Sequence, residues 1–156
     1  MVVRYLTVKR RTTHVAPRNL DAPPTRRIAI RSLIAAAGAA IINNLYSVIY
    51  TAITGFSIPE VINAGSITML SVLPVLLGGL VYWGISRLSL RTANIVLAAG
   101  TIALFIVFTI PTFGETIQAP GMDPTPTPEG FVGLSLGLHF AGPILLLALV
   151  PRWRTG

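Results

Sequence analysis

The amino-acid sequence predicts an all-α fold, an integral membrane four-helix transmembrane bundle. Composition is the first reason, because 53% of the 156 residues are hydrophobic and only 11% are charged, against about 25% charged residues in soluble domains. The second reason is a set of four apolar runs, each close to the ~20 residues that a helix needs to cross a bilayer. The third is the placement of the charges, which lie almost wholly outside these runs. Four runs are too few to close a β-barrel, so the backbone must satisfy its hydrogen bonds as helices.

The transmembrane domain is expected at residues 28–150, with spans at about 28–53, 67–85, 93–110 and 131–150. Residues 1–27 are basic and contain three prolines that interrupt a helix, which favours a disordered cytoplasmic tail. Organelle transit peptides are also Arg-rich and acid-poor, so a targeting role for this tail stays open. Residues 151–156 form a short cytoplasmic C-terminus.

Charge divides the connecting segments into two sets. With four spans, the tail, the 86–92 loop and the C-terminus share one side of the membrane. That side holds all 12 Lys and Arg residues, whereas the other side holds four of the five acids. The positive-inside rule places both termini in the cytoplasm, as expected for a multi-pass protein of the bacterial inner (plasma) membrane. Partners are then the bilayer itself and anionic lipid at the basic N-terminal flank, and the basic charge gives no reason to expect nucleic-acid binding.

The 111–130 loop on the opposite side is rich in proline, and its "DPTPTP" stretch predicts extended, polyproline-like backbone. A stiff spacer is the simpler interpretation. A docking surface for a partner outside the cytoplasm is the alternative.

Small and polar residues of a span usually face protein rather than lipid. In the first span these residues recur at spacings of three and four, which places them on one helical stripe: Ala36, Ala40, Asn44, Ser47, Thr51 and Thr54, with Asn43 beside them. The opposite side carries large apolar residues: Leu33, Ile41, Leu45, Val48 and Ile49. In the third span a weaker stripe contains Asn94, Ala98, Thr101 and Phe105.

The fourth span contains a ladder of small residues at every fourth position, Gly133, Gly137 and Ala141. Such a ladder allows another helix to approach closely, and we expect a helix-packing role for it. That contact is either inside the chain or at the seam of a homo-oligomer or larger membrane complex.

His139 is the one histidine inside a predicted span. At a rise of about 1.5 Å per residue, it lies at a depth similar to those of Asn43, Asn44 and Thr101. A buried imidazole needs a hydrogen-bond partner, so we expect an interhelical polar layer of Asn43, Asn44, Thr101 and His139. Intramembrane ionisable residues are also functional candidates. The functional alternatives are a proton relay, axial ligation of haem or a pigment, and metal ligation.

The sequence lacks the residues that several kinds of chemistry require. The sequence has no cysteine and no Asp or Glu in any span, which removes thiol chemistry and carboxylate-driven antiport. It also lacks the GxSxG and HExxH motifs of hydrolases and metalloproteases. We therefore expect no catalytic site, no metal site and no cofactor.

Two stretches carry a resemblance. They are "SIPEVINAGSITMLSVLPVLLGGLVYWGISR", which follows a first span with a basic start, and "LHFAGPILLLALVPR", which contains His139. Over about residues 26–152 the chain resembles an uncharacterised family of small four-span bacterial membrane proteins, a domain of unknown function. The longer basic tail and the proline-rich loop depart from that pattern. The resemblance implies the four-span fold and no activity.

These observations predict a non-catalytic membrane protein, an accessory or scaffolding component of a bacterial envelope complex. One alternative is a small transporter or channel that uses the polar layer around His139. A second alternative is a cofactor or pigment carrier in which His139 is the ligand.

Overall fold

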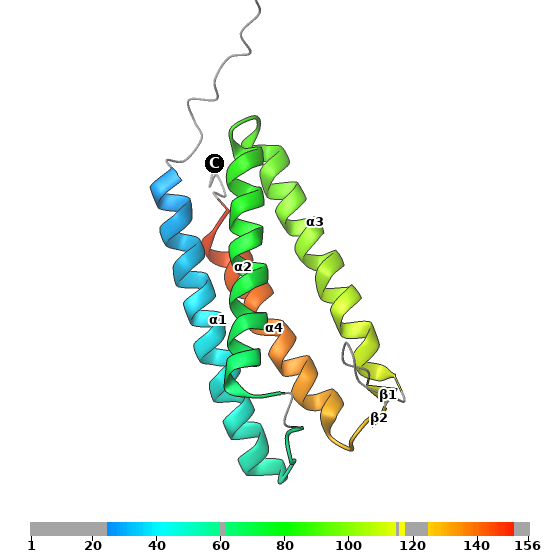
Figure 1. Cartoon of the computed structure of the whole chain (residues 1–156). Helices are drawn as coiled ribbons and strands as arrows, with labels where there is room; N and C mark the ends of the chain where they lie inside the picture. Colours follow the sequence, from blue (N-terminus) through cyan, green and yellow to red (C-terminus); the bar gives the residue numbers. More distant parts are fainter. Residues whose placement is uncertain (1–24, 60–61, 115, 118–124, 152–156) are drawn as a thin grey trace, which may run out of the picture.

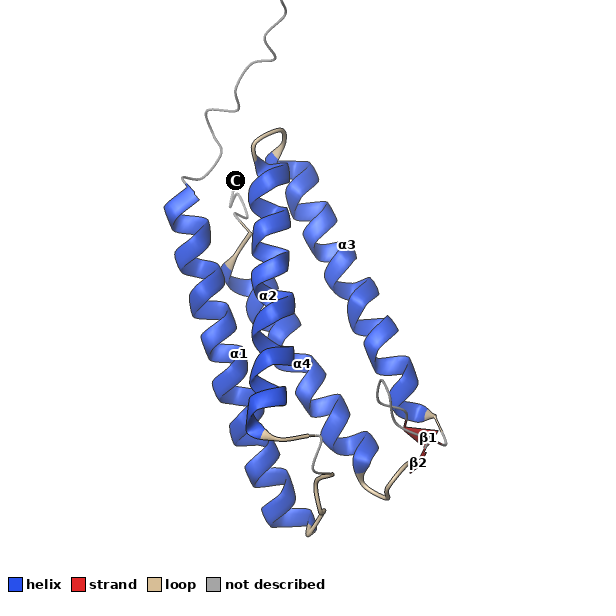
Figure 2. Cartoon of the chain, viewed as in Figure 1, coloured by secondary structure: helices blue, strands red, loops and turns tan. Residues whose placement is uncertain are grey.

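The computed structural model describes residues 25–59, 62–114, 116–117 and 125–151. The predictions for residues 1–24, for the "DPTPTP" stretch up to Pro124 and for residues 152–156 lie outside these ranges. Four long helices make up the fold (Figures 1 and 2): α1 (Thr25–Thr54), α2 (Ala64–Ser86), α3 (Leu90–Thr109) and α4 (Phe131–Leu149). A short 3-10 helix, η1 (Ile110–Phe113), continues α3, and strands β1 (Thr116–Ile117) and β2 (Thr125–Pro126) form a small antiparallel pair.

All four helices are long and apolar enough to span a membrane, α3 together with η1. The all-α four-helix prediction is therefore confirmed, with somewhat different helix ends. Helix α1 begins at Thr25 rather than Ile28, and α2 begins at Ala64 rather than Ile67. The β1–β2 pair was not predicted, because two-residue strands leave no periodic pattern in a sequence.

Local capping groups set the starts of α2 and α3. The side chain of Asn63 accepts a hydrogen bond from the backbone N–H of Ser66, and the Ser66 hydroxyl accepts one from the N–H of Asn63. The Ser89 hydroxyl likewise accepts from the N–H of Thr92 at the start of α3. These bonds satisfy amides that have no partner within the helix. Gly130 precedes α4 with a φ of 87°, a conformation that favours glycine.

Helix α1 packs along both α2 and α4, and α3 packs along the same two helices from the other flank (Figure 1). The α1–α2–α4 centre is built around small side chains, since Ala35 and Ala39 are fully buried. A Cβ placed on Gly79 of α2 would lie 2.0 Å from the Ser32 hydroxyl of α1. Close approach of α1 and α2 at this point therefore requires glycine.

The apolar side of α1 is exposed, as the sequence predicts. Its five large residues are between 54% and 67% exposed: Leu33, Ile41, Leu45, Val48 and Ile49. Many large apolar side chains on the outside are expected where the surroundings are lipid rather than water.

The interior stripe of α1 is rotated by about one residue from the predicted one. Its buried residues are Ile28, Ser32, Ala35, Ala36, Ala39, Asn43 and Ser47. Asn43 is thus at the centre of the buried face, and Asn44 is at its margin. Ala40 and Thr51 are half-buried. Thr54 is exposed, because the end of α1 extends past the bundle (Figure 1).

The alternating helix directions place described charges at two opposite ends (Figure 1). The start of α1, the α2–α3 connection and the end of α4 make up the basic end. Its described arginines are Arg26, Arg27, Arg31, Arg87 and Arg91. The opposite end is here called the acidic end. It contains Glu129, which lies just before α4 and is the one acidic residue among the described residues.

Candidate functional site

Asn43 joins three helices through its side-chain amide. Its Nδ2 donates to the Ser71 hydroxyl of α2 at 2.8 Å and to the backbone carbonyl of Leu138 in α4, also at 2.8 Å. Ser71 in turn donates to the Ile67 carbonyl of its own helix at 2.6 Å. Asn43 is only 3% exposed, so these bonds form inside the bundle where water does not compete.

Asn44 makes more peripheral contacts. Its Nδ2 donates to the Ala40 carbonyl of its own helix at 2.8 Å and to the Thr68 hydroxyl of α2 at 3.0 Å. Thr68 is exposed and Asn44 is half-buried. Asn44 therefore joins two helices at the margin of the bundle, whereas Asn43 joins three at its centre.

His139 has different neighbours from those expected. Its Nδ1 lies 3.4 Å from the Ser135 hydroxyl one turn earlier in α4, and Ser135 lies 3.1 Å from the Thr112 hydroxyl in η1. Within the described part of the chain, no hydrogen bond joins His139 to Asn43, Asn44 or Thr101. Thr101 itself is buried in α3.

The expected four-residue layer is therefore not joined by hydrogen bonds within the described residues: the asparagines bond to α2, His139 lies beside Ser135, and Thr101 is hydrogen-bonded to neither. Asn43 reaches α4 at Leu138, one residue before His139, so both lie at the same level of the bundle. Successive residues of a helix point about 100° apart, and Asn43 contacts the α4 backbone rather than the imidazole. Asn43 and His139 thus share a level of the bundle, but their side chains point in different directions.

The ladder of Gly133, Gly137 and Ala141 lies against α1 of the same chain. A Cβ on Gly137 would lie 2.1 Å from Cζ of Tyr46, and one on Gly133 would lie 2.6 Å from the Tyr50 hydroxyl. The two tyrosines also donate to carbonyls of this segment, Tyr46 to Gly133 at 2.8 Å and Tyr50 to Gly130 at 2.6 Å. The ladder is therefore a notch that holds two aromatic rings.

Sequence reasoning missed the role of Tyr46 and Tyr50. A usable signal exists, because these tyrosines are four residues apart in α1 and the glycines are four residues apart in α4. Residues four apart share a helix face, so a pair of large side chains matches a pair of gaps. Nothing within either helix alone indicates that the two faces meet.

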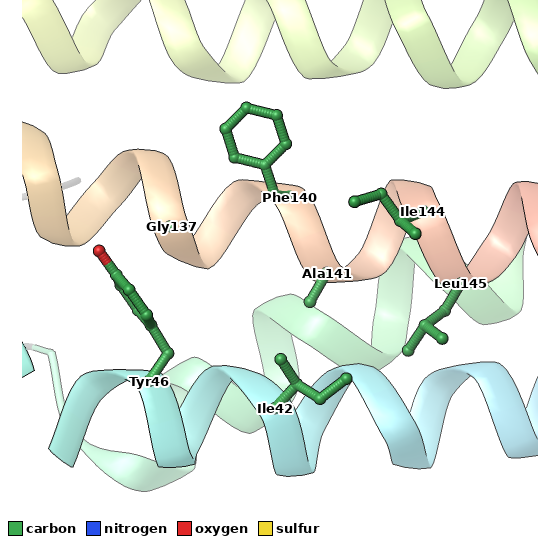
Figure 3. Close-up of a pocket in the computed structure, with 7 residues that line it drawn as sticks. All are labelled: Ile42, Tyr46, Gly137, Phe140, Ala141, Ile144 and Leu145. Atoms are coloured by element: carbon green, nitrogen blue, oxygen red, sulfur yellow. The ribbon is translucent and has the colours of Figure 1, made fainter. Parts of the chain in front are cut away.

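An apolar groove lies between α1 and α4 beside this notch (Figure 3). It has a volume of about 240 Å³, and its lining residues are Ile42, Tyr46, Gly137, Phe140, Ala141, Ile144 and Leu145. Figure 3 shows the Tyr46 side chain pointing to the helix at Gly137, and Ile42 lying below Ala141. Phe140 points toward α3, where its ring centroid lies 5.0 Å from that of Phe105.

At the basic end, Thr25 connects the start of α1 to the end of α2. Its hydroxyl accepts a hydrogen bond from Nε1 of Trp83 at 3.0 Å and another from the guanidinium of Arg87. The Arg87 guanidinium carbon also lies 5.5 Å from the centroid of the Trp83 ring, within cation–π range. An interfacial tryptophan and arginine are thus fixed at the point where two spans end.

The described residues contain no cluster of three or more His, Cys, Asp or Glu side chains that could hold a metal ion. No family model, curated protein or solved structure matches this chain. The resemblance to a four-span family therefore stays a prediction. The helices themselves establish the architecture of a small four-span membrane protein.

Proposed function

We propose that the chain is a non-catalytic accessory or scaffolding subunit of a bacterial envelope complex, with its basic end in the cytoplasm. The contacts of Asn43 carry this proposal. Its amide nitrogen holds α1, α2 and α4 together, which is a structural use of the most buried polar side chain of α1. Its Oδ1 has no hydrogen-bond partner among the described residues, but it is buried inside the bundle. A binding or transport site needs polar groups that a ligand can reach.

The transport alternative with a polar layer receives less support from this geometry. Both asparagine amides that would line the layer donate to groups of the chain itself. The groove beside α1 and α4 is lined by apolar side chains and the Tyr46 ring, and the Tyr46 hydroxyl donates to Gly133.

The groove gives the scaffold proposal a place for a partner. Ile42, Phe140 and Ile144 on its rim are between 47% and 59% exposed, and all belong to the spans. An apolar side chain from a neighbouring transmembrane helix would fill it by van der Waals packing, which drives association in lipid. We propose this groove as the contact with the partner subunit.

Purification in mild detergent tests the proposal. Chains that co-purify in a fixed ratio are identified by mass spectrometry for wild type, Ile144→Trp and Leu104→Trp. Ile144 is in the groove, whereas Leu104 is a similarly exposed residue of α3 outside it. We expect a partner that is lost with Ile144→Trp and retained with Leu104→Trp. A chain that purifies alone as a monomer would contradict the accessory role.

We also propose that the basic end contacts anionic lipid. Arg26, Arg27, Arg31 and Arg91 are exposed there, and no described acid lies among them. Each basic residue near an anionic leaflet contributes about 1 kcal/mol of attraction. Lipid analysis of the purified protein should show phosphatidylglycerol or cardiolipin retained over zwitterionic lipid, and loss of that preference in Arg31→Gln/Arg91→Gln.

A further inference from the structure

We infer that Thr112, Ser135 and His139 form a proton-binding relay whose outer residue, Thr112, is buried just beneath the acidic end of the bundle. The inference does not depend on the accessory role, because it concerns the opposite side of α4 from the groove. The relay gives His139 a role. The expected hydrogen bond between His139 and an asparagine is not formed within the described residues.

The three side chains form a continuous line across two elements. The Thr112 and Ser135 hydroxyl oxygens are 3.1 Å apart, and the Ser135 oxygen is 3.4 Å from Nδ1 of His139. Thr112 belongs to η1, where the third span ends; its own side chain is buried, and its neighbours Pro111 and Phe113 are exposed. From Phe131 to His139 helix α4 rises about 12 Å. The line therefore begins near the membrane surface and ends well inside the bilayer.

His139 faces the interior between α2 and α3 rather than α1. It shares one side of α4 with Ser135, one turn before it, and Gly142, nearly one turn after it. Ser135 meets η1, and a Cβ on Gly142 would lie 3.5 Å from Val75 of α2. The half-buried imidazole thus lies in the seam among α2, α3 and α4. The contacts with α1 lie on another side, at Gly133 and Gly137.

Hydroxyl groups both donate and accept, which is what a relay requires. The proposed uptake starts from the arrangement in which Thr112 donates to Ser135, Ser135 donates to Nδ1, and the imidazole carries its own proton on Nε2. Uptake moves the Ser135 proton to Nδ1, the Thr112 proton to Ser135, and a proton from hydronium at the acidic end to Thr112. The net result is one proton bound as imidazolium and one water released, with both hydroxyls restored.

The surroundings contain few other titratable groups. In α1, Tyr46 and Tyr50 lie on the far side of α4 with their hydroxyls on backbone carbonyls. In α2, Tyr82 is buried nearer the basic end. On α3, the buried hydroxyl-bearing side chains are Thr101 and Thr109, and the Thr109 hydroxyl has no hydrogen-bond partner within the described residues. Glu129 is the described carboxylate at the outer end of the relay. His139 is therefore the described group of this seam whose side chain can take up a proton to become a cation.

The test follows the protonation of His139 from each side of a membrane. The chain has one other histidine, His14, so His14→Gln leaves His139 as the only source of signal. The full-length variant is labelled with ¹⁵N-histidine and placed in proteoliposomes of phosphatidylglycerol and phosphatidylcholine. Trypsin cleavage of the basic tail determines the fraction inserted in each direction. Solid-state NMR then reads the imidazole ¹⁵N shift as pH is varied between about 5 and 8 on one side only.

We expect the imidazole to follow the pH at the acidic end and not the pH at the basic end. Ser135→Ala and Thr112→Val should abolish that response. Ser135→Thr, which keeps the hydroxyl, and Thr101→Val, which changes a buried hydroxyl outside the line, should retain it. An imidazole that stays neutral throughout, one that follows the basic end, or one that responds unchanged in Ser135→Ala would each overturn the relay.

Discussion

At the residue scale, Asn43 and Asn44 show how two identical neighbouring side chains acquire different roles. Both are asparagines of α1 at nearly the same depth, yet Asn43 is 3% exposed and Asn44 lies at the margin. The Asn43 amide bonds to two other helices, whereas Asn44 bonds to its own helix and to an exposed threonine. A rotation of 100° about the helix axis separates these two environments.

Asn43→Leu should therefore destabilise the bundle more than Asn44→Leu. Side-chain hydrogen bonds between transmembrane helices contribute about 0.6 kcal/mol on average and ~1.7 at most. Losing two such bonds should lower the free energy of unfolding by about 1–2 kcal/mol. Unfolding by SDS titration in detergent micelles measures both variants against wild type. An equal or larger loss in Asn44→Leu would show that the Asn43 contacts do not hold the helices together.

At the element scale, the contact between α1 and α4 depends on fitting aromatic rings into a notch. Gly137 leaves the space that the Tyr46 ring fills, and the Tyr46 hydroxyl is held by the Gly133 carbonyl. The tyrosine rings supply contact area between α1 and α4 that small side chains alone would not provide. The same notch forms one wall of the apolar groove.

Gly137→Ala should disrupt this contact, because the new Cβ would lie 2.1 Å from the Tyr46 ring. Overpacking of this kind costs about 1–3 kcal/mol, which thermal unfolding in detergent should detect as a lower Tm. Gly100→Ala is the matched control, since a Cβ at Gly100 has no heavy atom of the described structure within 4 Å. That control should be neutral or slightly stabilising, because alanine favours helix over glycine.

A second variant tests the physical reason. Tyr46→Ala vacates the space that the new methyl group needs, so the double variant with Gly137→Ala should lose less stability than the sum of the single losses. Residues in direct contact show such non-additivity. Strict additivity would mean that Gly137 acts through something other than the Tyr46 ring.

At the scale of the whole molecule, the arrangement of the helices separates charge along the bundle. The described arginines lie at one end, and Glu129 lies at the other. Thr25, Trp83 and Arg87 tie two spans together at the basic end. The positive-inside rule is the basis for proposing that this end lies in the cytoplasm.

Cysteine labelling tests this orientation, and the absence of cysteine from the chain makes wild type the blank. In intact cells, a membrane-impermeant maleimide should label Glu129→Cys, which lies exposed at the acidic end. Thr155→Cys should be labelled only after the cells are permeabilised. The reverse pattern would place the basic end outside and would contradict the proposed topology.

The sequence by itself determined the four helices, their approximate limits and the separation of charge. These are local properties, because apolar length decides which segments enter lipid and the bilayer then requires each to bond its own backbone. The exposed side of α1 also followed from the sequence, since five large apolar residues occupy one face. The constant rise per residue also gives an expected depth for each polar residue of a span.

Only the tertiary structure decided which side chains meet. In the structure, Asn43 donates hydrogen bonds to Ser71 and Leu138. The rings of Tyr46 and Tyr50 lie in the notch of α4. His139 lies beside Ser135, which in turn lies beside Thr112. The physical reason is that a span's own sequence fixes neither its neighbours nor its rotation beside them. An error of one residue in that rotation turns a side chain by about 100°, enough to move Asn44 from the centre of the bundle to its margin.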